Sequence, residues 1–153
     1  MPEYIKARRI MAFLSMPGEA NLDPWIERAM KEGKEIYIPV CLPEHQMEAG
    51  RLMSMEHFRE GPLGLRSLPK GYEVILPEAI DLVLVPAVAF GPDGGRLGMG
   101  AGYYDRFLCK VDYSRRIGCV WDFQVVDSVP QEDLDQPVAA VVTEKRLIRA
   151  IRS

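Results

Sequence analysis

Cysteine and histidine are scarce in this chain of 153 residues, which contains three cysteines and two histidines. Cys41, Cys109 and Cys119 lack the spacing of a metal-binding motif, and an odd number of cysteines does not suit a disulfide framework. His45 and His57 stand apart in the sequence, so we expect surface or packing roles for both. The cysteines therefore predict buried, reduced thiols and a cytoplasmic protein.

Long apolar runs and an excess of positive charge are also missing. The sequence shows no transmembrane run and no signal peptide. A net charge of −3 and a pI near 5.5 argue against a broad nucleic-acid surface, although they permit a local basic pocket. Hydrophobic residues make up 48% and charged residues 27% of the chain, the balance of a globular protein. We expect one domain over residues 1–153, with neither a nucleic acid nor a membrane as partner.

Strands and helices are predicted to alternate in the first part of the chain. Residues 9–14 turn apolar after their first charge and predict a strand. Asp23 and Pro24 are typical of a helix start, and Gly33 of its end, around an amphipathic segment. Residues 35–40 predict a second strand. A right-handed crossover makes these two strands parallel.

The middle of the chain is less regular, and the second half returns to strands. Residues 48–50 (Glu-Ala-Gly) predict a turn between short strands, and the glycines and prolines at 61–69 predict a loop. The continuous apolar run at 81–88 is typical of a strand buried on both faces. Residues 116–120 predict another strand and 139–143 the last one. The alternation predicts a single α/β domain with three layers (α/β/α) and a largely parallel sheet.

Glycines alternate in the segment FGPDGGRLGMGAGYYDRFL at residues 90–108. Gly98, Gly100 and Gly102 lack a Cβ, so the backbone N–H groups between them can curl around an anion. A predicted helix at 103–108 would add unpaired N–H groups at its start. The segment therefore predicts a phosphate site, although glycines in a strand-to-helix turn are also common for structural reasons alone.

Charged and aromatic residues flank these glycines. Arg96 could add a fixed charge to a phosphate site, and Asp105 could hold a divalent cation against the phosphate. Structural roles stay open: a salt bridge for Arg96, the helix dipole for Asp105, and packing for Tyr103 and Tyr104.

Acidic residues elsewhere read as loop residues from the sequence alone. Glu19 lies among ordinary turn residues, and Glu132, Asp133 and Asp135 form an acidic cluster in a polar connection. On their pattern alone, both features indicate solvated loops.

The glycine segment resembles the signature of the 5-formyltetrahydrofolate cyclo-ligases, also called 5,10-methenyltetrahydrofolate synthetases, which carry an RLGxGxGYYD core. The matching positions here are Arg96, Leu97, Gly98, Gly100, Gly102, Tyr103, Tyr104 and Asp105. The resemblance extends over residues 4–148 and includes FLSMPGE, KEIYIPV, PLGLRSLP, RIGCVWDFQ and VPQEDLDQPVAAVVTE. It implies the fold shared with ribose-phosphate isomerases and CoA transferases.

The resemblance also implies a reaction: ATP-driven, magnesium-dependent cyclisation of 5-formyltetrahydrofolate to 5,10-methenyltetrahydrofolate, with release of ADP and phosphate. In the family's mechanism the formyl oxygen is phosphorylated, N10 attacks the activated carbon, and phosphate leaves. The expected partner is therefore a small molecule, with or without a polyglutamate tail, and the protein is expected to be a monomer or a weak homo-oligomer.

Site residues follow from the same resemblance. ATP is expected to contact Arg96, Leu97, Gly98, Met99, Gly100, Ala101, Gly102, Tyr103 and Tyr104. The folate is expected to contact Leu14, Glu19, Met99, Gly100, Ala101, Gly102 and Tyr103. Asp105 and Asp135 are expected to hold magnesium, with Arg96 and Asp105 as the catalytic residues. A carboxylate such as Glu19 suits a pterin because it can accept paired hydrogen bonds from the amino-pyrimidine edge.

Three departures from the family pattern support an alternative. Family members usually begin with a longer helical region whose lysine and arginine reach the ATP phosphates, whereas residues 3–15 match the segment leading into the first strand. Ala101 stands where many relatives have lysine, and Leu134 and Ala139 stand where histidine and aspartate are usual. The alternative is a catalytically weakened or inactive relative that binds folate or nucleotide. A sugar-phosphate isomerase or CoA-ester enzyme is a third reading, which rests on fold alone.

Overall fold

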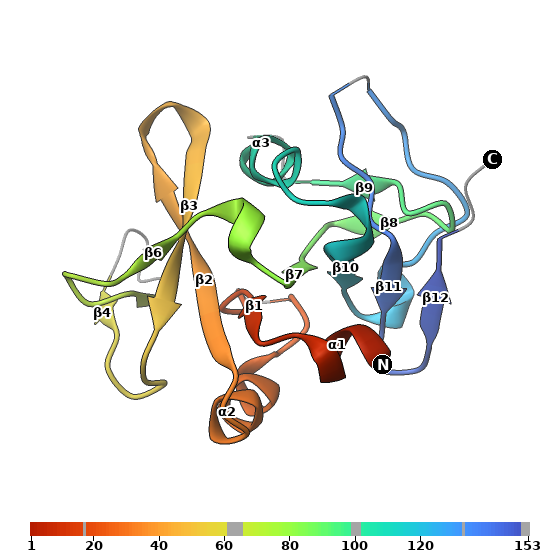
Figure 1. Ribbon diagram of the computed structural model, residues 1–153. Coiled ribbons are helices and arrows are strands. Elements are labelled where there is room, and N and C mark those ends of the chain that lie inside the picture. The colour runs from red at the N-terminus through yellow and green to blue at the C-terminus, as the bar shows by residue number, and fades with distance from the viewer. Residues whose placement is uncertain (17, 61–65, 99–101, 133, 151–153) are drawn as a thin grey trace.

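An eight-stranded sheet forms the centre of the protein, with the strand order β12-β11-β10-β7-β1-β2-β3-β6 (Figure 1). The computed structural model describes residues 1–16, 18–60, 66–98, 102–132 and 134–150. The strands of the sheet are β1 (Arg9–Met11), β2 (Glu35–Leu42), β3 (Gln46–Leu52), β6 (Val74–Ile75), β7 (Leu82–Val85), β10 (Arg116–Cys119), β11 (Ala140–Val142) and β12 (Leu147–Arg149). Two small antiparallel pairs lie outside it: β4 (Arg59–Glu60) with β5 (Arg66–Ser67), and β8 (Ala89–Phe90) with β9 (Arg96–Leu97).

The helices are short. They are α1 (Pro2–Lys6), α2 (Asp23–Lys31) and α3 (Tyr103–Leu108), with single 3-10 turns at η1 (Pro43–His45), η3 (Pro77–Ala79), η4 (Tyr113–Arg115) and η5 (Asp122–Gln124). Within the described part of the chain, no helix is long and apolar enough to cross a bilayer.

The five inner strands β11, β10, β7, β1 and β2 run parallel, and β12, β3 and β6 run antiparallel to their neighbours. Strand β1 lies between β2 and β7, with Ile10 opposite both Ile36 and Leu82. The prediction of a largely parallel sheet, with a parallel crossover from the first strand to the second, is confirmed.

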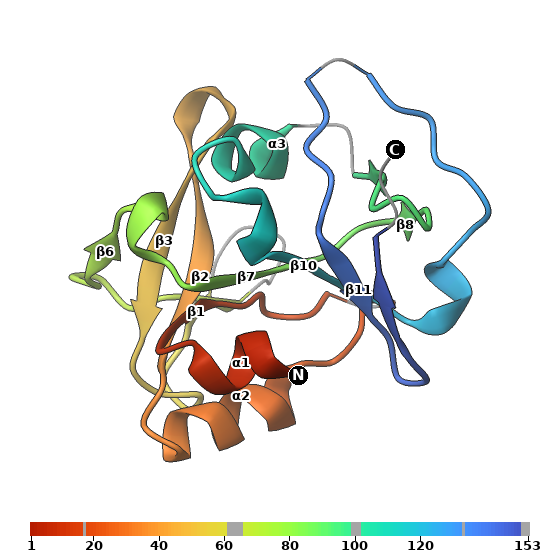
Figure 2. The ribbon, with the colours of Figure 1, turned by 45° about the vertical axis from the view of Figure 1, so that its right-hand side comes forward.

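Helices α1 and α2 cover one face of the sheet and α3 covers the other, which gives the predicted three layers (Figures 1 and 2). Strand β7 is buried at all four positions, and its residues alternate between the two faces. The core on the α2 side includes Ile10, Ile26, Ala29, Ile36, Leu82, Leu84 and Ile117. The core on the α3 side includes Val83, Val85, Phe90, Phe107, Leu108 and Val141. Burying each large apolar side chain contributes about 1.5–3 kcal/mol.

Residues 48–50 belong to strand β3, so the turn predicted there is wrong. Strands β2 and β3 form one long hairpin, paired from Ile36 opposite Leu52 to Leu42 opposite Gln46. Gly50 serves packing: a Cβ at this position would lie 2.6 Å from Leu68 Cδ1. The chain turns at η1, and the predicted loop at 61–69 lies largely outside the described residues.

Two smaller predictions also need correction. Strand β12 pairs with β11, so residues 139–143 are not the last strand. Helix α2 has Leu22 at its N-cap, whose side chain makes no capping hydrogen bond, while Asn21 Oδ1 accepts a hydrogen bond from the backbone N–H of Asp23 at 3.1 Å. The Asp23 carboxylate binds Arg66 instead, at 2.7 and 3.3 Å. Pro24 in the first turn and Gly33 at the helix end, with φ 89°, are confirmed.

The three cysteines are free thiols. Cys41 and Cys109 are exposed, so the prediction that the thiols are buried is wrong for them. Cys119 is partly buried, and burial raises the pKa of its thiol to about 11. At pH 7 this thiol is protonated.

Candidate active site

The predicted site residues that the structure describes lie around the edge where the parallel strands end. Leu14 and Glu19 follow β1, Arg96 lies on β9 beyond the end of β7, and Asp105 lies in α3. In open parallel sheets, ligands bind at this carboxyl edge. We call the site formed here the carboxyl-edge site.

Arg96 is a buried cation at the centre of this site, with only 8% of its surface exposed. Its Nε donates a hydrogen bond to the Pro86 carbonyl at 2.8 Å, just beyond the end of β7. Its Nη1 lies 3.8 Å from Asp105 Oδ1, and its guanidinium carbon lies 5.0 Å from the centre of the Tyr104 ring. Arg96 therefore ties the end of β7 to helix α3.

Burial lowers the pKa of the Arg96 guanidinium, and the negative charges of Asp105 and Asp135 oppose that shift. Arginine starts so far above neutral pH that this one remains protonated. Burial raises the pKa of Tyr104 and the charge of Arg96 opposes it, so the phenol stays neutral. The site thus holds a permanent positive charge beside two carboxylates.

The glycines of the segment have distinct structural reasons. At Gly98 a Cβ would lie 2.8 Å from Nη1 of Arg96 and 3.2 Å from Nη2, so the guanidinium occupies that space. Gly102 adopts the left-handed conformation, with φ 77°, and a Cβ there would meet open space. Predicted contacts at Met99, Gly100 and Ala101 lie outside the described residues.

Asp105 and the segment that carries Asp135 are brought together. Asp105 Oδ1 accepts a hydrogen bond from the backbone N–H of Gln136 at 3.1 Å. Asp135 Oδ2 accepts one from the backbone N–H of Glu132 at 2.8 Å, which closes a turn. Both carboxylates act on Arg96 electrostatically. The two predicted magnesium ligands therefore both lie near Arg96.

This pair fits magnesium only with help from a ligand. In the described residues, no group of three or more His, Cys, Asp or Glu is placed to hold a metal ion. The hydrogen bonds above use Oδ1 of Asp105 and Oδ2 of Asp135. Magnesium commonly takes one or two carboxylates and completes its shell with phosphate oxygens and water. The donor set matches that pattern.

The loop after β1 forms another side of the site. Leu14 is partly buried against the core on the α2 side. Glu19 is partly buried, and its Oε1 accepts a hydrogen bond from the backbone N–H of Met16 at 2.7 Å. The negative charge of Glu19 acts on Tyr104, which links this loop to α3.

His45 and Arg106 also reach the site, although no role there was predicted for them. The His45 and Tyr103 rings lie 5.6 Å apart between centroids, and Arg106 Nη1 donates to the Glu44 carbonyl at 3.0 Å. Both contacts depend on where the β2–β3 hairpin ends, and the predicted turn at 48–50 misplaced that end.

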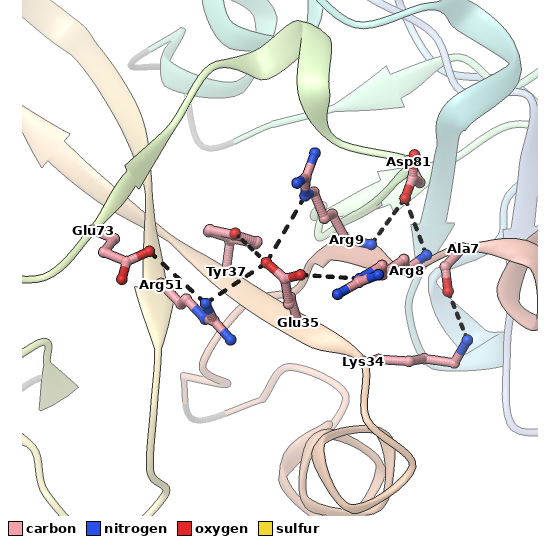
Figure 3. Close-up of polar contacts among 9 residues, drawn as sticks. All are labelled: Ala7, Arg8, Arg9, Lys34, Glu35, Tyr37, Arg51, Glu73 and Asp81. Carbon is pink, nitrogen blue, oxygen red and sulfur yellow. Dashed lines mark hydrogen bonds and ion pairs between the residues drawn. The ribbon is translucent and has the colours of Figure 1, made fainter.

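The opposite edge of the sheet, where the inner strands begin, is closed by ion pairs (Figure 3). Glu35 lies 3.1 Å from Arg8, 3.8 Å from Arg9 and 3.7 Å from Arg51. Asp81 accepts hydrogen bonds from the backbone N–H groups of Arg8 and Arg9, at 3.0 and 2.9 Å. We call this group the amino-edge cluster. Its cations are engaged with their own carboxylates, away from the carboxyl-edge site.

Two hollows lie at this amino edge. One, of about 370 Å³, is lined by residues that include Ala7, Asp81 and Arg115. The other, of about 240 Å³, is lined by residues that include Glu35 and Arg51. Neither is lined by a predicted site residue.

Comparison with known proteins gives one consistent family. The model of the 5-formyltetrahydrofolate cyclo-ligase family matches residues 1–144. A 5-formyltetrahydrofolate cyclo-ligase of Escherichia coli (strain K12) is 34% identical over 154 residues, covering 95% of this chain and 83% of the relative. A probable 5-formyltetrahydrofolate cyclo-ligase of Schizosaccharomyces pombe is 29% identical over 167 residues, covering 99% of this chain and 82% of the relative.

Solved structures agree. The NMR structure of Aquifex aeolicus 5,10-methenyltetrahydrofolate synthetase has a TM-score of 0.84 and 33% identity, covering 100% of this chain and 77% of that one. A 5,10-methenyltetrahydrofolate synthetase from Mycoplasma pneumoniae shares the fold, with a TM-score of 0.70 at 21% identity over 92% of this chain and 75% of that one. This chain belongs to the 5-formyltetrahydrofolate cyclo-ligase family.

Proposed function

We propose that this chain catalyses the ATP-dependent cyclisation of 5-formyltetrahydrofolate to 5,10-methenyltetrahydrofolate, with release of ADP and phosphate. The observation that carries the proposal is the hydrogen bond from Gln136 to Asp105 beside the buried Arg96. It joins the family's glycine segment to its acidic turn at the edge of the sheet where ligands are expected.

The chemistry requires activation of a poor leaving group. The formyl oxygen attacks the γ-phosphorus of ATP, and the bond to ADP breaks. The N10 electron pair then attacks the formyl carbon, the N10 proton is lost, and the carbon–oxygen bond breaks to release phosphate. No covalent enzyme nucleophile is required, so the protein's task is alignment and stabilisation of charge.

ATP is proposed to contact Arg96, Leu97, Gly98, Met99, Gly100, Ala101, Gly102, Tyr103 and Tyr104. Arg96 is buried, so it would act mainly through its fixed charge, next to Gly98. In a dry environment such a charge acts over a longer range than it would in water. The left-handed Gly102 and the open space around it support a close approach of ligand to backbone.

The folate is proposed to contact Leu14, Glu19, Met99, Gly100, Ala101, Gly102 and Tyr103. The partly buried Glu19 supports this, because its charge acts on Tyr104 at the start of α3. Its carboxylate would accept hydrogen bonds from the amino-pyrimidine edge of the pterin.

Asp105 and Asp135 are proposed to hold magnesium together with ATP oxygens. When bound, the ion would neutralise part of the phosphate charge. We propose that the reaction takes place in the cytoplasm, because the three cysteines are free thiols. The partner would be the small-molecule folate, and the protein a monomer or weak homo-oligomer.

The test mixes purified protein with magnesium, ATP and 5-formyltetrahydrofolate and follows the ultraviolet absorption of the methenyl product. Wild type is expected to form product and Asp105→Asn to lose most of its activity. Asp112→Asn is the matched control, since Asp112 is exposed and pairs with Arg115 away from the site. Product formed equally by both variants would refute the role of Asp105. Binding of both ligands by calorimetry without turnover would select the inactive, binding relative.

A further inference from the structure

The tip of the β2–β3 hairpin reaches across to helix α3 (Figures 1 and 2). Leu42 and Gln46 form the last pair of the hairpin, and η1 closes it. Arg106 Nη1 donates a hydrogen bond to the Glu44 carbonyl at 3.0 Å, although 62 residues separate them in the sequence. The tip is therefore held against the helix that follows the glycine segment.

The backbone of this tip is strained. Glu44 has φ 62° and His45 has φ 59°. Every other residue with positive φ in the described part of the chain is a glycine. The left-handed region favours glycine and is adopted more readily by asparagine, aspartate and histidine than by other residues, whereas glutamate adopts it reluctantly. Strain of this kind persists only where the surrounding structure holds it, and it is concentrated near functional sites.

The strained turn places an imidazole against the carboxyl-edge site. The His45 ring lies 5.6 Å from the Tyr103 ring, at an interplanar angle of 58°. Tyr103 is the first residue of α3 and directly follows the left-handed Gly102. His45 is exposed and Tyr103 is partly buried, so the ring pair lies at the surface of the site.

We infer that His45 is a positioning residue of the carboxyl-edge site, which fixes the Tyr103 ring against which a flat ligand ring would pack. This rests on the proposed function, in which Tyr103 contacts both ATP and the folate. His45 acts through Tyr103 and takes no part in proton transfer. A tilted aromatic pair limits the orientations of both rings, so its loss leaves Tyr103 free to rotate.

The kinetic test compares His45→Ala with His45→Phe, which keeps a ring, and with His57→Ala as the matched control. His57 is the other exposed histidine and lies near Ser54, outside the site. We expect His45→Ala to raise the KM of ATP or of 5-formyltetrahydrofolate by about two- to tenfold, the worth of one aromatic pair, with kcat within about twofold. His45→Phe should restore the wild-type KM. Unchanged KM values, or a fall in kcat alone, would overturn the inference.

A double-mutant cycle distinguishes the loss of the His45–Tyr103 contact from general damage to the fold. In a Tyr103→Leu background, His45→Ala should have no further effect on KM, because the partner ring is already gone. Additive effects would contradict the inference. Thermal unfolding of each variant shows whether it is folded.

A second readout does not depend on turnover. Imidazole NMR signals of His45 should shift in Tyr103→Leu, and in wild type when ATP or 5-formyltetrahydrofolate is added, while His57 signals stay in place. Shifts without product formation would count against the proposed function and leave the role of His45 intact. If product forms but neither ligand moves the His45 signals, the proposed function stands and the inferred role of His45 is wrong.

Discussion

The guanidinium of Arg96 fills the space that a side chain at Gly98 would need, with Nη1 only 2.8 Å from the position of its Cβ. The same guanidinium is bound to the Pro86 carbonyl and lies beside the Tyr104 ring. Two residues of the family signature, Arg96 and Gly98, are therefore in direct contact. This arginine and this glycine are needed for each other before any ligand arrives.

Gly98→Ala should displace either the Arg96 guanidinium or the backbone at Gly98, because the new Cβ and the guanidinium need the same space. A shift of about 1 Å at a phosphate-transfer site lowers kcat/KM by roughly 10- to 100-fold. The measurement is methenyl product formation at varied ATP. Gly71→Ala is the control, since a Cβ at Gly71 would meet open space and the substitution is strained only by the φ of 83° at that residue. The control should lose about 1 kcal/mol of unfolding free energy with wild-type kinetics.

Arg96→Lys should reduce both stability and activity, because an ammonium cannot bond Pro86, approach Asp105 and lie flat beside Tyr104 at once. We expect a loss of about 2–4 kcal/mol in unfolding free energy by urea denaturation. Arg8→Lys is the matched control. Its side chain is 77% exposed, so the loss there should stay below about 1 kcal/mol. Equal losses in the two variants would show that Arg96 is not a structural anchor.

Low pH should weaken the ion pairs of the amino-edge cluster and so lower the stability of the fold. The pKa of Glu35 is held below its usual 4.5 by the hydrogen bond from Tyr37, with help from Arg8, Arg51 and Arg9. A carboxylate with a lowered pKa contributes stability that is fully present above its unfolded pKa and is lost as pH falls through the folded value.

Urea midpoints of wild type should therefore fall as pH drops from about 5 toward 3. Glu35→Gln should be less stable than wild type at pH 7, and the difference between them should narrow over this range. A constant difference would mean that Glu35 does not titrate as the ion pairs require.

Lys34→Met should loosen helix α1. The Lys34 ammonium donates to the carbonyls of Tyr4 and Ala7 at 2.9 and 2.7 Å, and it lies 4.5 Å from the Tyr4 ring centre. We expect the free energy of unfolding to fall by about 1–2 kcal/mol and the amide of Ala7 to exchange faster. Lys31→Met, on the exposed side of α2, should behave as wild type. Protection of α1 that survives the loss of Lys34 would contradict the capping role.

The sheet core and α3 could be predicted from the sequence because their signals are local. The apolar run at 81–88 contains the fully buried β7, and the segment after the glycines forms α3 as expected. The hairpin could not be predicted, since the packing reason for Gly50 comes from Leu68 and Tyr72. Neither residue is adjacent to it in the sequence.

The sequence named candidate site residues but not their geometry. The motif includes Arg96 and Asp105, but a charged residue looks the same in sequence whether it faces a ligand or its neighbours in the fold. Burial of Arg96 follows from tertiary packing alone. His45 escaped prediction because its approach to Tyr103 depends on the hairpin register and on two left-handed residues.

The bond between Gln136 and Asp105 spans 31 residues of sequence, and residue 136 lies just ahead of β11, which pairs with β10. This contact needs β11 in its place on β10, because β11 fixes the segment that carries Gln136. We therefore expect a nascent chain to gain affinity for its ligands only when the last strands have joined the sheet. Ligand binding would then report that folding is complete.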